Sequence, residues 1–278
     1  MRRYLPPAVL AAMWRFYRRT EQAELDLIAA GVAFYAFLAI FPAAAAVIAI
    51  WGFLFDPNVI RQEVALIAGF LPPDAYTLIN TQVEALLAVN TSSLGWATLL
   101  STLFALWSAR AGVAALIRGL NAIHHLPNRS GHWHQLRAIV LTFIIVGLVL
   151  AALVLAVVLP LIFAYMPFAE QYSGALAKSN LLWGLMAGAM AVGLAYRLGP
   201  NYPTHRPPLL SWGLLVALIL WFLATRGFML YLANFPSYNR VYGSIGAVAA
   251  LLMWLYVSAY AVLLGAAVDA ELSRRKRP

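Results

Sequence analysis

The chain has 278 residues, of which 63% are hydrophobic and only 10% are charged, and its mean hydropathy is +0.80. Soluble domains are nearer half apolar and a quarter charged, because a folded core in water cannot bury more apolar surface than that. The composition therefore predicts a membrane protein and excludes a soluble enzyme, a disordered chain and a secreted disulfide scaffold. The lack of cysteine also excludes disulfides, thiol nucleophiles and cysteine-ligated metal sites.

The apolar stretches between charges predict the number of crossings. A helix needs about 20 apolar residues to cross the hydrocarbon of a bilayer, and six stretches are long enough for one crossing each. The alternating pattern of barrel strands is missing. We therefore predict an all-α, polytopic membrane protein, with one membrane domain over 1–278 and six transmembrane helices, near 28–54, 94–109, 139–164, 181–197, 209–232 and 243–267.

The basic residues are distributed unevenly along these spans. Six crossings put both termini on one side, and that side then holds 15 of the 19 Arg and Lys residues. Cytoplasmic loops carry such an excess, so both termini are predicted to be cytoplasmic, with 268–278 as a basic tail. The same asymmetry explains the net charge of +9 without a nucleic-acid partner.

Two segments outside the spans have helical patterns. Within 1–26, the stretch Ala8 to Asp26 is amphipathic and predicts a helix in the inner interface, with an ordinary solvated helix as the alternative. The outer loop 56–93 contains two short apolar-rich helical patterns, Val59–Phe70 and Ala75–Val89, divided by a Pro-Pro pair. We expect this loop to cap the outer surface.

Arg226 is the most informative charge inside a predicted span. If that span begins at Leu209, Arg226 lies about 26 Å along the helix, just inside the outer boundary. It can extend to outer phosphates, or it can bind an anionic head group in a cavity. The polar residues that follow fit either a turn with an interfacial tyrosine belt or a polar pocket; they are Asn234, Tyr238, Asn239 and Arg240.

Proline and glycine mark two further features. Pro42 in the first predicted span removes a helical hydrogen bond, so it predicts a kink that is either a hinge or simple kinked packing. Gly184 and Gly188 form a small-xxx-small pair, for which internal helix packing is favoured over a dimer face.

Four histidines cluster in the predicted inner loop 110–138, at positions 124, 125, 132 and 134. The loop contains no Asp or Glu, whereas catalytic divalent-metal sites normally use carboxylates. We therefore expect a solvated basic loop near anionic lipids, with no metal site. No hydrolase triad, phosphate loop or zinc-hydrolase helix is present, so we expect neither an enzyme nor a cofactor.

The C-terminal run 234–272, NFPSYNRVYGSIGAVAALLMWLYVSAYAVLLGAAVDAEL, resembles the signature end of the YihY/virulence factor BrkB family. Upstream, FYAFLAIFP at 34–42 resembles the first-span motif of that family. LWSARAGVAALIRGLNAI at 106–123 and YRLGPN at 196–201 resemble its second-span and fourth-span exits. The resemblance covers most of residues 28–272. Members commonly carry Glu after the closing Gly-Ala, where this chain has Ala267, with Asp269 and Glu271 nearby; the departure puts any role of that Glu in doubt.

The resemblance implies a multi-pass protein of the bacterial cytoplasmic (inner) membrane. Members were once labelled ribonuclease BN, and they have been linked to envelope integrity and to the movement of lipids or lipid-like precursors. Because the inner loop has no carboxylates for a catalytic metal, this sequence gives the ribonuclease label no support.

The leading hypothesis is handling or translocation of an anionic lipid or lipid-like envelope precursor. The alternatives are a non-transporting envelope-integrity scaffold and, more remotely, a membrane-bound ribonuclease. Membrane lipids are the expected partners, and a homo-oligomer is compatible with the sequence. The expected head-group ligands are Arg226, Arg240, Asn234, Tyr238 and Asn239 on the outer side and Arg110, Arg118 and Arg197 on the inner side, with Pro42 as the hinge.

Overall fold

The computed structural model describes residues 14, 16–18, 20–54, 61–62, 64–65, 68, 73–87, 95–127, 132–164, 169–202, 207–234 and 236–275. The regular elements in this part of the chain are α-helices, as the sequence predicts. They are α2 (Leu25–Leu54), α4 (Pro73–Leu87), α5 (Gly95–Ile123), α6 (His132–Ala164), α7 (Ala169–Leu198), α8 (Trp212–Asn234) and α9 (Pro236–Arg275).

Six of these helices correspond to the six predicted spans. Among the described residues, four stretches are long and apolar enough to cross a membrane, namely Leu25–Ala43, Leu99–Ile123, Trp212–Tyr231 and Ile245–Ser273. The described parts of α6 and α7 contribute the shorter apolar stretches His132–Leu148 and Gly184–Leu198. The chain is thus a helical membrane protein with several apolar helices, while six crossings, cytoplasmic termini and a single domain stay predictions.

Two residues with left-handed backbone set helix boundaries that hydropathy does not reveal. Glu24, with φ of 48°, separates the preceding helical residues from α2, so the predicted amphipathic helix does not continue to Asp26. Residues 1–13 of that prediction lie outside the described residues. At the other boundary, His125 has φ of 52°, and Leu126 N donates to Asn121 O at 2.8 Å. This is a Schellman-type C-cap, and it ends α5.

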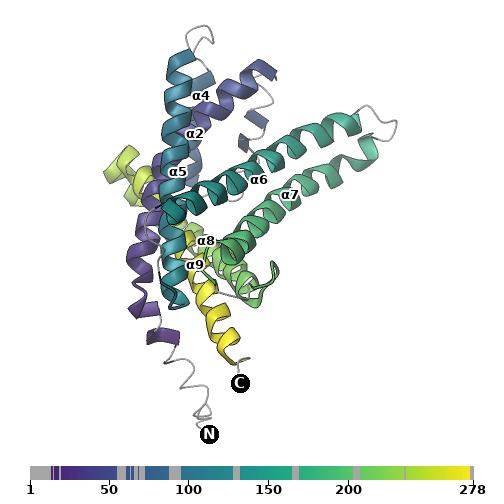
Figure 1. The fold of residues 1–278 in the computed structure, drawn as a ribbon. Coiled ribbons are helices and arrows are strands. Elements are labelled where there is room, and N and C mark those ends of the chain that lie inside the picture. The colour runs from purple at the N-terminus through teal and green to yellow at the C-terminus, as the bar shows by residue number, and fades with distance from the viewer. Residues whose placement is uncertain are drawn as a thin grey trace.

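Buried apolar side chains, both small and large, hold α2, α5 and α9 together. The shared core includes Ala29, Leu120, Ile123, Leu263 and Ala267, and α8 packs against α9. The beginning of α2 and the end of α9 lie at the same end of the molecule (Figure 1). The α6–α7 pair runs side by side and extends away from α2 and α5 (Figure 1).

The second helix predicted in the outer loop is confirmed as α4, which packs against α9 and α2. Arg61 Nε lies 2.9 Å from Glu84 Oε1, a salt bridge whose two side chains are each almost half exposed. Such exposed pairs contribute about 1 kcal/mol or less. The first predicted helix of this loop falls largely outside the described residues.

The predictions made from Pro42 and from the glycine pair in the fourth predicted span have different outcomes. α2 continues past Pro42 without interruption, and the hinge stays a prediction. The predicted internal packing at Gly184 and Gly188 is wrong among the described residues, since a methyl group added at either would have no described atom within 4 Å. Close helix contacts through glycine occur at other positions, such as Gly119 of α5 and the crossing of α8 and α9.

Candidate functional site

The first turn of α8 is held by side chains from two directions. The hydroxyl of Ser211 accepts a hydrogen bond from Leu214 N at 3.1 Å, which is an N-cap. Asp269 of α9, only 9% exposed, accepts one from Gly213 N at 2.7 Å through Oδ1. A carboxylate at a helix N-terminus is also favoured by the helix dipole.

The backbones of α8 and α9 nearly touch beside this bond. A Cβ atom added at Gly265 would lie 2.4 Å from Gly213 O, and one added at Gly213 would lie 2.3 Å from Gly265 O. The buried hydroxyl of Tyr196 donates to Val262 O one turn earlier in α9. Only glycine at both positions permits this crossing.

The connector after α7 is tied to the end of α5 by a second set of polar contacts. Asn121, which is fully buried, accepts a hydrogen bond from Asn201 N at 2.8 Å. The Asn201 amide donates to Pro127 O at 3.0 Å and accepts from Arg137. Tyr202 and His124 are joined by an O···Nε2 hydrogen bond of 2.9 Å. Burial, and then the charge of Asp269, raises the pKa of Tyr202.

The sequence reasoning did not place these polar residues in a site. A signal was present for four of them, because Asn121, Tyr196, Asn201 and Asp269 lie in three separate motifs that carry the family resemblance, the ones ending the second and fourth spans and the C-terminal run. The structure brings those motifs to one end of the helices. Ala267, at the position where family members commonly carry Glu, is fully buried in the core. Asp269 is two positions further along α9 and faces another direction.

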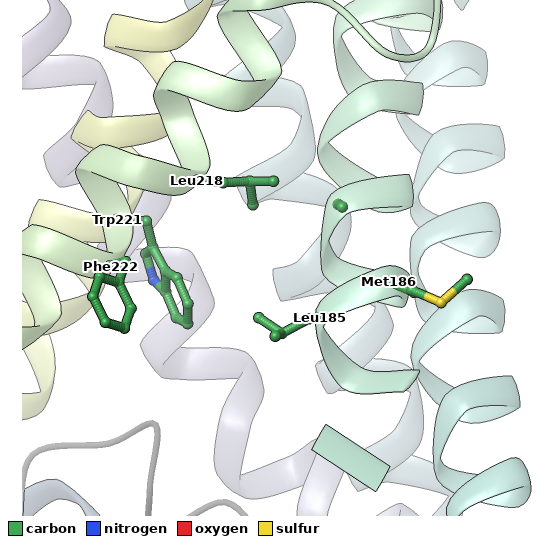
Figure 2. A pocket seen from close by; sticks show the side chains of 6 residues that line it. Leu185, Met186, Leu218, Trp221 and Phe222 are labelled. Carbon is green, nitrogen blue, oxygen red and sulfur yellow. The ribbon is translucent and has the colours of Figure 1, made fainter. Parts of the chain in front are cut away.

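An apolar groove lies between α7 and α8. Its volume is about 380 Å³, and its walls are side chains from both helices (Figure 2): Leu185, Met186, Ala189, Leu218, Trp221 and Phe222. The indole of Trp221 donates to Ser258 Oγ of α9 at 3.1 Å, which orients this wall.

Arg226 lies next to this groove. Its Cζ atom is 5.3 Å from the ring centroid of Phe222, one turn earlier on α8, in a cation–π contact. Because α8 begins at Trp212 and not at Leu209, Arg226 is 14 residues along the helix, or about 21 Å. This is about 5 Å less than the distance from Leu209 that the sequence indicated.

The other predicted outer ligands can be placed only by their backbones. Asn234 ends α8, and α9 begins at Pro236, a residue that suits the first turn of a helix. Tyr238, Asn239 and Arg240 are therefore helical, whereas the sequence pattern placed them between the fifth and sixth predicted spans. The side chains of all four residues lie outside the described part.

On the predicted inner side, the structure places two of the three arginines together. Arg110 donates to Gln135 Oε1. Burial, then the charge of the exposed Arg118 and then that of Arg110, lowers the pKa of the neighbouring His134. Arg197 is exposed on the last turn of α7 and has no described contact with them. Among the described residues, no three His, Asp or Glu side chains are placed to hold a metal ion.

The long apolar helices define a polytopic helical membrane protein. A sequence model of the family described as virulence factor BrkB matches residues 16–278. The chain therefore belongs to the YihY/virulence factor BrkB family.

Three relatives illustrate the range of similarity. The putative ribonuclease-like protein YfkH of Bacillus subtilis is 26% identical over 255 residues, which cover 89% of this chain and 90% of YfkH. The UPF0761 membrane protein of Aeromonas salmonicida is 46% identical over 66 residues, 24% of this chain and 23% of that protein. The one of Photobacterium profundum is 40% identical over 93 residues, 34% of this chain and 28% of that protein. The chain thus matches only about a quarter of the length of these two UPF0761 proteins. No solved structure matches the chain.

Proposed function

We propose that this protein binds and handles an anionic amphiphile of the bacterial inner membrane, a phospholipid or a lipid-like envelope precursor, without catalysing a reaction. One acyl chain lies in the α7–α8 groove and the anionic head group lies at Arg226. The observation that carries the proposal is the contact between Arg226 and Phe222, because Phe222 is also a wall of the groove.

The groove alone cannot select a ligand. All six of its lining side chains are apolar, as an acyl chain requires. In a bilayer, however, lipid tails are as apolar as leucine, so only close packing favours the groove over the surrounding lipid. Selectivity must therefore come from the head group, and Arg226 is the charged side chain in position to supply it.

Arg226 itself favours an anionic ligand. A cation inside the hydrocarbon of a bilayer is costly, up to about 3 kcal/mol at its centre and less near its boundary, and no described carboxylate forms a salt bridge with Arg226. The face of Phe222 offsets part of that cost. A phosphate oxygen would offset more, because guanidinium–phosphate hydrogen bonds are charge-assisted and bidentate.

The groove supports lipid handling over a purely structural scaffold. A purely structural scaffold predicts helices whose own side chains fill the space between them, whereas about 380 Å³ is open between α7 and α8. The ribonuclease alternative is supported by a relative's name alone. Translocation needs more than the groove, since a head group that crosses the membrane requires a polar path.

Cysteine cross-linking tests the proposal, because any introduced cysteine is the only thiol in the chain. Ala189→Cys carries a benzophenone into the groove, and the protein is placed in nanodiscs of phosphatidylglycerol or phosphatidylcholine. We expect preferential cross-linking to phosphatidylglycerol. Arg226→Gln should reduce this cross-linking about tenfold, because one charge-assisted interaction is lost. Arg226→Lys should largely retain it.

Met190→Cys is the matched control, because Met190 is adjacent, exposed and not part of the groove wall. It should cross-link both lipids equally. Equal cross-linking of both lipids at position 189, or no effect of Arg226→Gln, would contradict the proposal. Labelled-lipid movement in proteoliposomes, wild type against Arg226→Ala, tests translocation separately.

A further inference from the structure

A cluster of basic residues lies between α5 and α6, apart from the groove between α7 and α8. Arg110, Ala114 and Arg118 are spaced by four residues, so they lie along one side of α5. Ala114 is buried in the same small core as Ala138 of α6, which shows that this side of α5 packs on α6. Arg110 donates to Gln135 Oε1 in the first turn of α6.

His134 is the neighbour of Gln135 and is partly buried. Its Nε2 atom is buried and has no hydrogen-bond partner among the described residues. Burial, then Arg118, then Arg110 lowers the pKa of His134, so the ring is neutral at pH 7. His132 and Arg137 are the other titratable or charged residues of this helix turn, and Arg137 is engaged by Asn201 and Pro200.

We propose that Arg110, Arg118 and His134 form a binding site for a phosphate-bearing anion, separate from the α7–α8 groove. Guanidinium groups recognise phosphate through bidentate hydrogen bonds, and a neutral imidazole offers a further N–H donor. Among the described residues, neither arginine forms a salt bridge with a carboxylate that would compete. The first turn of α6 adds the positive end of its helix dipole.

The position of the cluster allows two sources for the anion. Arg110 and Arg118 follow the predicted second span, and His134 precedes the predicted third span. The cluster is therefore expected at the inner surface of the membrane. There, the phosphate of a lipid head group and a free phosphate ion can both reach it, and they share the chemistry that the site recognises.

Thermal melting of the purified full chain in phospholipid-free detergent tests the free ion. Inorganic phosphate is compared with chloride at equal ionic strength, and a ligand that binds the folded state raises Tm. We expect Arg118→Gln to weaken phosphate binding about tenfold, Arg118→Lys to weaken it less, and Arg18→Gln to leave it unchanged. Arg18 is the control because it lies over Trp14, in the helical residues before α2.

Lipid retention in native mass spectrometry, with phosphatidylglycerol against phosphatidylcholine, tests the head group with the same variants. If only phosphate raises Tm, the site binds a free ion. If only phosphatidylglycerol is selectively retained, the site binds a lipid head group. Either result supports the proposal when Arg118→Gln weakens the observed binding. If neither response differs between Arg118→Gln and Arg18→Gln, the proposal is overturned. These assays use neither Ala189 nor Arg226, so their failure leaves the groove proposal standing.

A pH titration adds a readout that a structural role would not move. A bound anion favours the imidazolium form of His134, so binding takes up a proton and strengthens as pH falls from 8 to 6. Sulfate is the probe, because it does not titrate in this range. His134→Gln should abolish the pH dependence; a pH dependence equal to that of the wild type would contradict the role of His134.

Discussion

The carboxylate of Asp269 accepts a hydrogen bond from the backbone nitrogen of Gly213 at 2.7 Å, and this bond joins the last turns of α9 to the first turn of α8. It lies where the two backbones approach through Gly213 and Gly265. The polar residues at this end of the helices therefore position α8. The groove and Arg226, further along the same helix, depend on that placement.

Removal of the Asp269 carboxylate should destabilise the protein. We expect Asp269→Ala to cost about 1–2 kcal/mol, the usual effect of losing a helix-capping carboxylate. Asp269→Asn retains an acceptor oxygen and should cost less. Thermal melting in detergent measures both, with Glu21→Ala at an exposed position as the control. A melting temperature unchanged in Asp269→Ala would show that the bond does not hold α8.

The α8–α9 crossing should not tolerate a single added methyl group. Gly265→Ala would place Cβ 2.4 Å from Gly213 O, so the helices must separate. We expect a loss of about 1–3 kcal/mol, typical of overpacking. Gly227→Ala on α8 is the control, because its Cβ would have no described atom within 4 Å. If the two alanine variants melt alike, the close approach is not a constraint.

The predicted topology can be tested with single cysteines, since the chain has none of its own. Gln82→Cys lies at an exposed position in α4, and Ser273→Cys lies at an exposed position near the end of α9. Six crossings with cytoplasmic termini predict that an impermeant maleimide added to intact spheroplasts labels position 82 and not position 273. Labelling of position 273 from outside would contradict the orientation, whereas both positions should react in lysed membranes.

His134 should make the protein less stable in acid. Because its folded-state pKa is below the ordinary histidine value of 6.5, the unfolded chain takes up the proton first as pH falls. Stability is therefore unaffected above about pH 6.5 and declines below it. In chloride buffers, His134→Gln should reduce the fall in Tm between pH 7 and pH 5.5, whereas His125→Gln at an exposed position should not. An equal fall in both variants would contradict this assignment.

The positions of the helices could be predicted because hydropathy is a property of contiguous residues. Their ends could not. Glu24 and His125 end helical segments because their backbone is left-handed, and neither residue type predicts that conformation. α9 includes the polar stretch after Pro236, which the apolar pattern assigned to a loop.

The parts of the candidate site that are local in sequence could be predicted, and the contacts between distant residues could not. Arg226 is conspicuous as a charge within an apolar run, and its contact with Phe222 follows from the spacing of four residues along a helix. The bond between Asn121 and Asn201 joins residues 80 positions apart, so only the fold brings them together. The spacing of Gly184 and Gly188 did not reveal a partner helix, whereas Gly213 and Gly265 meet from different helices.

The most direct test of the central claim is a cryo-electron microscopy structure of the full chain in phosphatidylglycerol nanodiscs, with a bound antibody fragment for alignment. We expect tubular lipid density between α7 and α8, in contact with Ala189 and Leu218, ending in head-group density at Arg226. A groove filled by the protein's own side chains, with Arg226 paired to a carboxylate of the chain, would contradict the proposed lipid site.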